Sequence, residues 1–353
     1  MKPTIIFVGG FLGAGKTTLI LAAARELNRR GMRSAAILND QSEALVDTQL
    51  AELHGVPNGE VTEGCFCCRL SDLTAQLEAM LAHAPDVIFA EPVGSCTDIA
   101  ATVLHPLLED AVYRVAPFTV LVDPQRAETL TRDGADNDIV FLFRKQLEEA
   151  DLVCLTKSDI HPAPPELGIP GVRQISAHTG QGIAAWLDEV LANELSSHKG
   201  VLDIDYARYA QAEAALAWLN LHAVFQVREP ISPAMLLGPW IDGIDRAATG
   251  AGIQIVHLKA IVQAPTGYIK AALCANGEEP RVEGNLDASA SMRHEIKLNI
   301  RALADPDGLS AIVSRELQQL DGHLEECKMR CFRPAAPRPE RRMVREEIAA
   351  RSS

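Results

Sequence analysis

Residues 9–18, with the sequence GGFLGAGKTT, follow the short apolar run TIIFV at residues 4–8. The stretch matches the phosphate-loop pattern G-x-x-x-x-G-K-[ST], and it stands between a predicted strand and a predicted helix, the setting that this pattern needs. Glycines let successive backbone N–H groups face phosphate oxygens, and the amino end of the helix adds partial positive charge. The stretch therefore predicts a nucleoside triphosphate site on an α/β sheet.

Residues of this loop have separate predicted roles. Lys16 neutralises the β and γ phosphates and acts in catalysis, and the Thr17 hydroxyl binds Mg²⁺. The alternative, a glycine-rich turn that only joins a strand to a helix, is disfavoured because the pattern is complete. The other residues predicted to bind the nucleotide here are Gly10, Gly13, Ala14, Gly15 and Thr18.

Length and composition limit the possible classes of protein. A chain of 353 residues exceeds what one core usually supports, so a second domain is expected. The net charge of −14 argues against a nucleic-acid-binding protein, which would show clustered Lys and Arg. No apolar run reaches membrane-spanning length, and we expect a cytoplasmic protein without a membrane partner. Eight cysteines in such a chain indicate metal or thiol chemistry rather than disulfides.

The first half of the chain alternates short apolar strands with helices. This order predicts an α/β fold with a mostly parallel sheet and ligands at the carboxyl ends of the strands. The second half predicts a smaller α+β domain, with strands at 216–227, 253–263, 267–275 and 294–303 and helices at 232–249 and 309–320. The predicted divisions are a nucleotide domain at 1–195, a linker at 196–212, the α+β domain at 213–325 and a tail at 326–353.

Acidic residues follow two of the predicted strands. Asp40 follows the second strand, where it binds Mg²⁺ directly or through water or caps a helix. Asp47 could also reach the Mg²⁺ ion, but for this residue the helix-capping role is favoured. Glu91 ends a buried strand and is followed by glycine three residues later, so we expect it to hold Mg²⁺ or to position attacking water.

Three thiols lie within four residues in Gly64-Cys65-Phe66-Cys67-Cys68. Thiolates select soft ions such as Zn²⁺, and three of them leave an open fourth position that suits metal transfer. A redox role is the other functional possibility. Cys96 is either an extra thiol or, as a lone cysteine more often is, structural.

The last part of the chain contains Cys327 and Cys331, four residues apart. On a helical turn they would share one face, where they either hold a second ion or are unpaired thiols in a mobile tail. The Pro- and Arg-rich end is predicted to be disordered or to dock on an acidic partner.

Two further loops resemble a guanine-selecting site. Thr156, Lys157 and Asp159 resemble the NKxD element with Thr in place of Asn, and Asp159 would accept from the guanine N1 and N2 groups. Ser176 and Ala177 resemble the loop whose N–H reaches guanine O6. Adenine would leave such buried partners unpaired, so GTP is favoured over ATP.

Together, GGFLGAGKTT, GCFCC, the Glu91-x-x-Gly94 strand end and TKSD resemble the CobW-type GTPases, which are related to the metallochaperones UreG and HypB. The resemblance covers residues 1–195 strongly and the C-terminal segment weakly. It implies GTP hydrolysis coupled to delivery of Zn²⁺ or Co²⁺, or to insertion of a corrinoid, with Cys65, Cys67 and Cys68 as the metal site. It also implies a client metalloprotein or corrinoid protein and a nucleotide-dependent homodimer.

This chain departs from the family pattern in two loops. It has N-D-Q-S at residues 39–42 instead of N-E-F-G, and E-P-V-G-S-C at 91–96 instead of E-T-x-G-L, which indicates a specialised subgroup. Two other classes of function stay open. A small-molecule kinase would use the same phosphate loop but needs neither three adjacent thiols nor a guanine selector. A non-catalytic metal store or sensor would tolerate the loss of Lys16.

Overall fold

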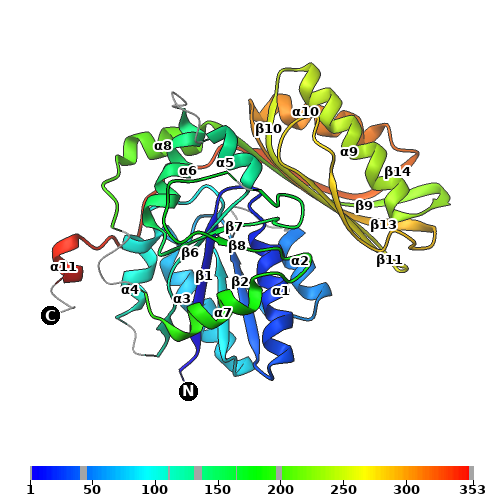
Figure 1. Cartoon of the computed structure of the whole chain (residues 1–353). Coiled ribbons are helices and arrows are strands. Elements are labelled where there is room, and N and C mark those ends of the chain that lie inside the picture. The colour runs from blue at the N-terminus through cyan, green and yellow to red at the C-terminus, as the bar shows by residue number, and fades with distance from the viewer. Residues whose placement is uncertain are drawn as a thin grey trace. The chain divides into compact units, whose positions relative to one another are not determined.

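The computed structural model describes residues 2–39, 46–109, 112–130, 137–163, 165–195 and 201–349. Contacts divide the chain into two compact units (Figure 1). The first unit comprises residues 1–41, 47–212 and 336–353, and the second comprises 42–46 and 213–335. The end of the chain therefore belongs to the first unit, while the boundaries drawn from sequence remain a prediction.

A parallel sheet forms the centre of the first unit. Within the described residues it has eight strands, in the order β3-β2-β4-β1-β6-β7-β8, with β5 also paired to β1. Every pair is parallel, which confirms the predicted α/β class. The strands are β1 Thr4–Gly10, β2 Ser34–Asn39, β3 Asn58–Val61, β4 Val87–Glu91, β5 Arg114–Val115, β6 Thr119–Val122, β7 Leu152–Leu155 and β8 Arg173–Gln174.

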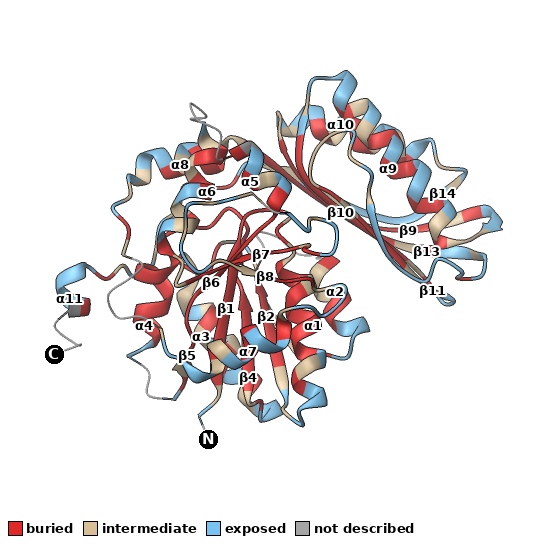
Figure 2. Cartoon of the chain, in the orientation of Figure 1, coloured by how far each residue is buried: buried red, intermediate tan, exposed pale blue. Residues whose placement is uncertain are grey.

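The central strands are buried along their whole length (Figure 2). Their continuous apolar runs, rather than alternating patterns, are what a parallel sheet covered on both faces requires. The helices of this unit are α1 Lys16–Arg29, α2 Val46–Leu53, α3 Leu70–Met80, η1 Leu81–His83, η2 Ala100–Leu104, α4 His105–Leu107, α5 Pro124–Leu130, α6 Asp138–Glu149, α7 Ile183–Ala192, α8 Tyr206–Ala214, which crosses into the second unit, and α11 Arg345–Ala349.

The second unit is an antiparallel sheet covered by helices on one face, as predicted for an α+β domain (Figure 1). Its described strands follow the order β12-β11-β10-β13-β9-β14. Alternate residues of β9, including Leu219, Leu221 and Phe225, face a core that is also lined by the helices α9 (Pro233–Gly250) and α10 (Pro306–Gln318). The elements are β9 Leu216–Ile231, α9 Pro233–Gly250, β10 Gln254–Ala264, β11 Gly267–Leu273, β12 Arg281–Gly284, β13 Ser291–Leu303, α10 Pro306–Gln318 and β14 Gly322–Phe332.

The predicted helical turn around Cys327 and Cys331 is wrong. Both residues lie on β14, which pairs antiparallel with β9. Four residues along a strand span roughly 13 Å, so these two thiols cannot bind one ion in this conformation. For the end of the chain the sequence left two alternatives, disorder or docking on an acidic partner, and the described residues 336–349 do not fit the first, because they make the contacts within the first unit that are given below.

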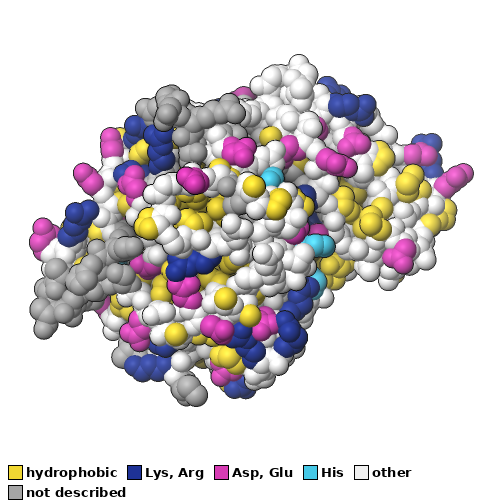
Figure 3. All heavy atoms as spheres, in the orientation of Figure 1, with side chains coloured by type: hydrophobic (Ala, Val, Ile, Leu, Met, Phe, Trp, Pro, Cys, Tyr) yellow, Lys and Arg dark blue, Asp and Glu magenta, His cyan; other side chains and the backbone are white. Residues whose placement is uncertain are grey.

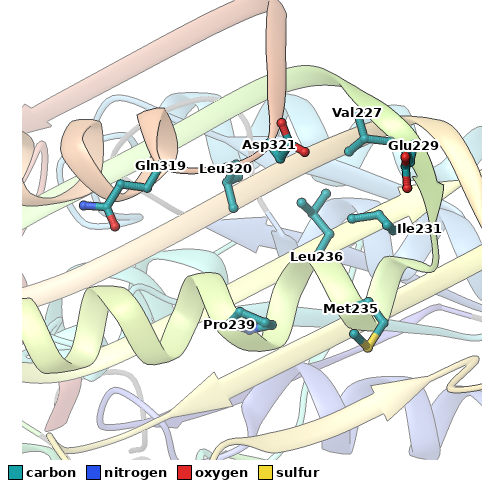
Figure 4. A pocket seen from close by; sticks show the side chains of 9 residues that line it. All are labelled: Val227, Glu229, Ile231, Met235, Leu236, Pro239, Gln319, Leu320 and Asp321. Carbon is teal, nitrogen blue, oxygen red and sulfur yellow. The ribbon is translucent and has the colours of Figure 1, made fainter.

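A hollow in the second unit lies where the start of α9 meets the ends of β9 and α10 (Figure 4). Its lining is mainly apolar, with two acidic side chains, Glu229 and Asp321. Met235, one of the lining residues, is 67% exposed. None of the residues predicted for a site lines this hollow.

Charged side chains of both signs are interspersed over the face of the molecule shown in Figure 3. That face therefore carries no large basic patch of the kind that binds a phosphate backbone. Among the helices of the described residues, none has both the length and the apolar character needed to cross a membrane.

Candidate functional site

The loop between β1 and α1 has a backbone shape that favours glycine at three positions, Gly10, Gly13 and Gly15. Gly10 has a φ of 135°, and a Cβ there would lie 2.5 Å from the carbonyl oxygen of Leu121. Gly15 has a φ of 89° at the amino end of α1, and no side chain of a described residue caps that end. N–H groups at an uncapped helix start attract anions, so the loop is shaped for a phosphate group. The other predicted loop residues are Gly13, with a φ of 84°, buried Ala14 and half-buried Thr18.

Buried polar side chains converge beside this loop. Lys16 Nζ donates to the carbonyl oxygen of Gly10 at 3.1 Å and lies 3.8 Å from a carboxylate oxygen of Glu91. Thr17 Oγ1 lies 2.9 Å from Glu91 Oε2 and 2.8 Å from Asp47 Oδ1. Two carboxylates around one hydroxyl form a cluster of hard oxygen atoms, which is the donor set that Mg²⁺ prefers.

The structure describes two of the three acidic residues considered in the sequence as Mg²⁺ ligands or helix caps. Glu91 ends β4 and lies beside both Lys16 and Thr17. Asp40 lies outside the described residues, so its role stays a prediction. Asp47, which the sequence favours as a helix cap, stands in the first turn of α2 and also contacts Thr17. The structure thus brings a second carboxylate to Thr17 from a position that the sequence did not favour.

The loop after β4 packs against the phosphate loop. A Cβ at Gly94 would lie 2.7 Å from the Leu12 side chain and 3.1 Å from Lys16 Nζ. Gln146 on α6 holds this loop, because its Nε2 donates to the carbonyl oxygens of Gly94 at 3.0 Å and Cys96 at 2.8 Å. The loop that follows Glu91 is therefore held where a γ-phosphate could contact it.

Glu149, at the end of α6, supports the same loop from a fully buried position. Its carboxyl oxygens accept from the backbone N–H of Ala100 and from Thr97 Oγ1, each at 3.2 Å. Burial raises the pKa of Glu149 well above its usual value, which favours the protonated form. A neutral acid can fix the loop without leaving an isolated charge in the core.

The two loops with a resemblance to guanine selectors are neighbours. The backbone N–H of Ser158, after β7, donates to the carbonyl oxygen of Ile175, after β8, at 3.3 Å. Lys157 has a φ of 58° and its ammonium group pairs with Asp123. Asp159 is exposed at the end of this loop. The remaining predicted residues are Thr156 and Ser176, both buried, and Ala177, which is half-buried.

Cys65, Cys67 and Cys68 form a compact cluster of sulfur atoms. Their Sγ atoms are 2.7 Å apart for Cys65 and Cys67, 3.4 Å for Cys65 and Cys68, and 3.8 Å for Cys67 and Cys68. Zn–S bonds of about 2.3 Å in a tetrahedral site put sulfur atoms about 3.8 Å apart. The distance between the Cys67 and Cys68 sulfur atoms has that length. The shortest distance, between the Cys65 and Cys67 sulfur atoms, would lengthen by about 1 Å on metal binding. In the part of the chain that the structure describes, this is the only group of three or more candidate ligands that meet so closely.

Asn39, the last residue of β2, holds the thiol loop on both sides. Its Nδ2 donates to the carbonyl oxygens of Val61 at 2.8 Å and Gly64 at 2.7 Å, and its Oδ1 accepts from the N–H of Phe66 at 2.8 Å. Asn39 was not predicted as a site residue. The available signal was an amide residue at the buried end of a strand, where a side chain needs hydrogen-bond partners.

The thiols of this loop resist ionisation while they are metal-free. Hydrogen bonding to Cys65 raises the pKa of Cys68 to about 11. Contacts with Cys65 and Cys68, followed by burial, raise the pKa of Cys67 well above its usual value. A metal ion binds thiolates, so loading the site must release protons.

The end of the chain packs against the thiol loop. The N–H of Arg338 donates to Cys68 Sγ at 3.1 Å, and the N–H of Glu340 donates to the carbonyl oxygen of Cys67 at 3.0 Å. The Glu340 carboxylate accepts from the N–H and from the hydroxyl of Ser71, each at 2.9 Å. Residues 336–349, which we call the C-terminal strap, thus contribute to the wall of the thiol site.

The C-terminal strap also contacts the loop after β4. Arg342 Nε donates to Asp98 Oδ2 at 2.7 Å, and the N–H of Met343 donates to the carbonyl oxygen of Ala101 at 2.9 Å. Asp98 is fully buried, has a φ of 62°, and accepts a further bond from the Tyr206 hydroxyl at 2.7 Å. One segment therefore bridges the thiol loop and the loop beside the phosphate site. This bridge could not be predicted from the sequence, because a run of arginines does not indicate which buried carboxylate one of them pairs with.

Comparisons with known proteins identify relatives of the first half of the chain. Residues 4–168 match the family described as CobW/HypB/UreG, nucleotide-binding domain. A protein named "Zinc chaperone CobW" from Sinorhizobium sp is 29% identical over 203 residues, which are 49% of this chain and 55% of that protein. "Zinc chaperone YjiA" from Escherichia coli (strain K12) is 30% identical over 170 residues, which are 45% of this chain and 51% of that protein. The chain thus spans about half the length of the curated relatives it matches.

Solved structures also resemble this chain. The crystal structure of Zn(II)-bound YjiA GTPase from E. coli aligns over 89% of this chain and 99% of that chain, with 14% sequence identity and a TM-score of 0.39.

Proposed function

We propose that the protein is a GTPase that handles a metal ion, because residues 4–168 match the family described as CobW/HypB/UreG, nucleotide-binding domain. It binds GTP with Mg²⁺, hydrolyses the γ-phosphate, and uses the nucleotide state to control how tightly a thiophilic metal ion is held. The observation that carries this proposal is structural contact between the two sites. The loop at residues 91–98 packs on the phosphate loop at Gly94 and is tied to the thiol loop through the C-terminal strap.

The residues around the phosphate loop are suited to GTP hydrolysis. Lys16 offsets the charge of the β and γ phosphates, and Thr17 with Asp47 and Glu91 supplies oxygen ligands to Mg²⁺. In this proposal Glu91 also orients the attacking water, and the N–H of Gly94 contacts the γ-phosphate. Asp159 with Thr156, Lys157, Ser176 and Ala177 selects guanine in this proposal.

The thiol loop is suited to a soft divalent ion. Three sulfur atoms within 3.8 Å of one another match a thiolate site, and such ligands favour Zn²⁺ or Co²⁺ over Mg²⁺. The relatives named zinc chaperones make Zn²⁺ the first choice. The ion is cargo that passes to a client, which we propose to be a metalloprotein or a corrinoid protein, and two copies of the chain assemble in the GTP state.

GTP turnover and metal binding by matched variants test this proposal. We expect hydrolysis of GTP in preference to ATP, loss of turnover in Thr17→Ala, and loss of Zn²⁺ binding in Cys65→Ser/Cys67→Ser/Cys68→Ser. Cys327→Ser, which changes an exposed thiol on β14, is the matched control and should keep both properties. Phosphoryl transfer to a small molecule without water as acceptor would support the kinase class instead. Zn²⁺ binding without GTP turnover would support a metal store.

A further inference from the structure

The C-terminal strap covers the least buried thiol of the cluster. Cys65 and Cys67 are only 6% and 1% exposed, whereas Cys68 is half-buried. A metal ion, or a ligand that takes the ion away, would therefore reach the cluster from the Cys68 side. The N–H of Arg338 donates to Cys68 Sγ at 3.1 Å, so the strap lies on that side of the site.

Glu340 attaches the strap to the helix that follows the thiol loop. The side chain of Arg69, the residue before α3, makes no capping hydrogen bond at the start of this helix. Instead, the Glu340 carboxylate accepts from the N–H and the hydroxyl of Ser71, each at 2.9 Å. A carboxylate at the amino end of a helix is stabilised by the N–H groups and the helix dipole. This contact therefore holds the strap against the end of the thiol loop.

The next residues of the strap are attached to the loop after β4 and to η2, which follows that loop. Arg342 pairs with the fully buried Asp98, and the N–H of Met343 donates to the carbonyl oxygen of Ala101. Gly94, in the same loop as Asp98, packs on the phosphate loop. A movement of this loop with the nucleotide would thus act directly on the attachment of the strap.

The strap is built as a segment that can detach. Residues 333–344 form no helix or strand. Among the described side chains of the strap, the apolar ones that are buried are Met343 and Ile348, while Arg338 and Glu340 beside the thiol loop are exposed. A segment with few buried apolar side chains opens at a lower free energy than the sheet on which it lies. The strap can therefore leave the thiol loop while the rest of the unit stays folded.

We propose that the C-terminal strap is a gate on the thiol site, attached over a bound ion in one nucleotide state and detached in the other. This inference rests on the proposed function and names the part of the chain that controls metal exchange. When the loop after β4 moves with the nucleotide, Arg342 and Met343 lose their partners and the strap leaves the thiol loop. Cys68 is then uncovered, and the ion can meet a ligand from the client.

Metal loading and attachment of the strap stabilise each other. Metal binding converts the Cys68 thiol to a thiolate. A hydrogen bond to a charged acceptor is stronger than one to a neutral acceptor, so the N–H of Arg338 binds the loaded site more tightly. By linkage, the attached strap also holds the ion more tightly than the detached strap does.

Hydrogen exchange of the full-length wild-type protein tests the gate without any mutation. The Zn²⁺-loaded protein is measured in Mg²⁺-GDP and in a non-hydrolysable Mg²⁺-GTP analogue, and the transfer of Zn²⁺ to a chelator is timed in the same two states. We expect the amides of residues 336–349 to exchange faster in the state that gives up Zn²⁺ faster. Equal strap exchange in the two states, or faster exchange in the state that keeps the ion, would refute the gate and leave the proposed function intact. A protein that binds no Zn²⁺ would overturn both.

Two variants of the strap provide the second measurement. Glu340→Ala and Arg342→Ala each remove side-chain bonds that hold the strap, and we expect each to speed the transfer of Zn²⁺ at least about 10-fold in the slower nucleotide state. Glu346→Ala, at an exposed glutamate of the same segment, and Arg341→Ala, at a surface ion pair, are the matched controls and should keep the wild-type rate. Wild-type transfer rates in both strap variants would refute the gate.

Discussion

Substituting Arg342 with alanine removes the cation that pairs with a fully buried carboxylate. Arg342 Nε donates to Asp98 Oδ2 at 2.7 Å, and its Nη2 donates to the carbonyl oxygen of Leu202 at 2.8 Å. The Asp98 side chain has no exposed surface, whereas the Arg342 side chain is 30% exposed. Without Arg342, Asp98 keeps its bond from the Tyr206 hydroxyl but loses its counter-charge.

The free-energy cost of Arg342→Ala depends on how deeply the Arg342–Asp98 ion pair is buried. Removing one partner of a fully buried ion pair costs about 3–5 kcal/mol. Arg342 is partly exposed, so water can enter its place, and we take instead the value of about 1.5–3 kcal/mol for hydrogen bonds to a charged group. If the substitution destabilises the attached state of the C-terminal strap by this free energy, hydrogen-exchange protection of the strap amides falls about 10- to 150-fold.

Hydrogen exchange followed by mass spectrometry measures this loss of amide protection directly. The N–H groups of Glu340 and Met343 are bonded to the carbonyl oxygens of Cys67 and Ala101 in the attached strap, so peptides covering residues 336–349 should exchange faster. Arg341→Ala is the matched control, since Arg341 pairs with Glu109 at the surface, where such a pair contributes about 0–1 kcal/mol. Equal protection in the two variants would show that Arg342 does not hold the strap.

Three other substitutions have expected outcomes. Asn39→Ala should lower Zn²⁺ affinity about 10- to 100-fold in a chelator competition, because it frees the thiol loop on both sides, while Asn58→Ala, which loses one local bond to Val56, should not. Gly10→Ala should lower the urea midpoint far more than Gly55→Ala. Both have positive φ, which costs about 1–3 kcal/mol, but only at Gly10 would the Cβ meet a backbone oxygen. Glu149→Gln should remove one contribution to the pH dependence of the free energy of unfolding. Burial raises the pKa of Glu149, so the folded protein keeps a proton that the unfolded chain loses above its ordinary pKa of 4.5. Wild-type stability relative to the variant should therefore fall as pH rises above that value, by at most about 1.4 kcal/mol per pH unit up to the folded pKa, as measured by urea unfolding. A flat difference across that range, or similar midpoints for the two glycine variants, would contradict the corresponding argument.

The parts of the fold that the sequence predicted are those written in contiguous residues, whereas the roles of the site residues stay predictions. The phosphate loop and the thiol loop each lie within ten residues, and the apolar runs before them predict the strands that carry them. A parallel sheet then brings the carboxyl ends of those strands to one edge, which is why Glu91 was expected near Lys16. Local patterns were enough for these residues.

The contacts that the sequence did not favour or did not predict depend on tertiary structure. Asp47 meets Thr17 across 30 positions, and Arg342 meets Asp98 across 244 positions. No spacing rule predicts such pairs. The helical turn around Cys327 was wrong for another reason: β14 is rich in charged, exposed residues, so the apolar alternation typical of a strand is weak there, as it often is at a sheet edge.

In the proposed function the affinities for the metal ion and for the nucleotide depend on each other, and a linkage cycle measures this dependence. Zn²⁺ affinity is measured in Mg²⁺-GDP and in a non-hydrolysable Mg²⁺-GTP analogue, and the affinities for both nucleotides are measured with and without Zn²⁺. We expect the ratio of Zn²⁺ affinities to equal the change that Zn²⁺ causes in the preference between nucleotides, with a value between about 5 and 150. A ratio of one in both arms would contradict it.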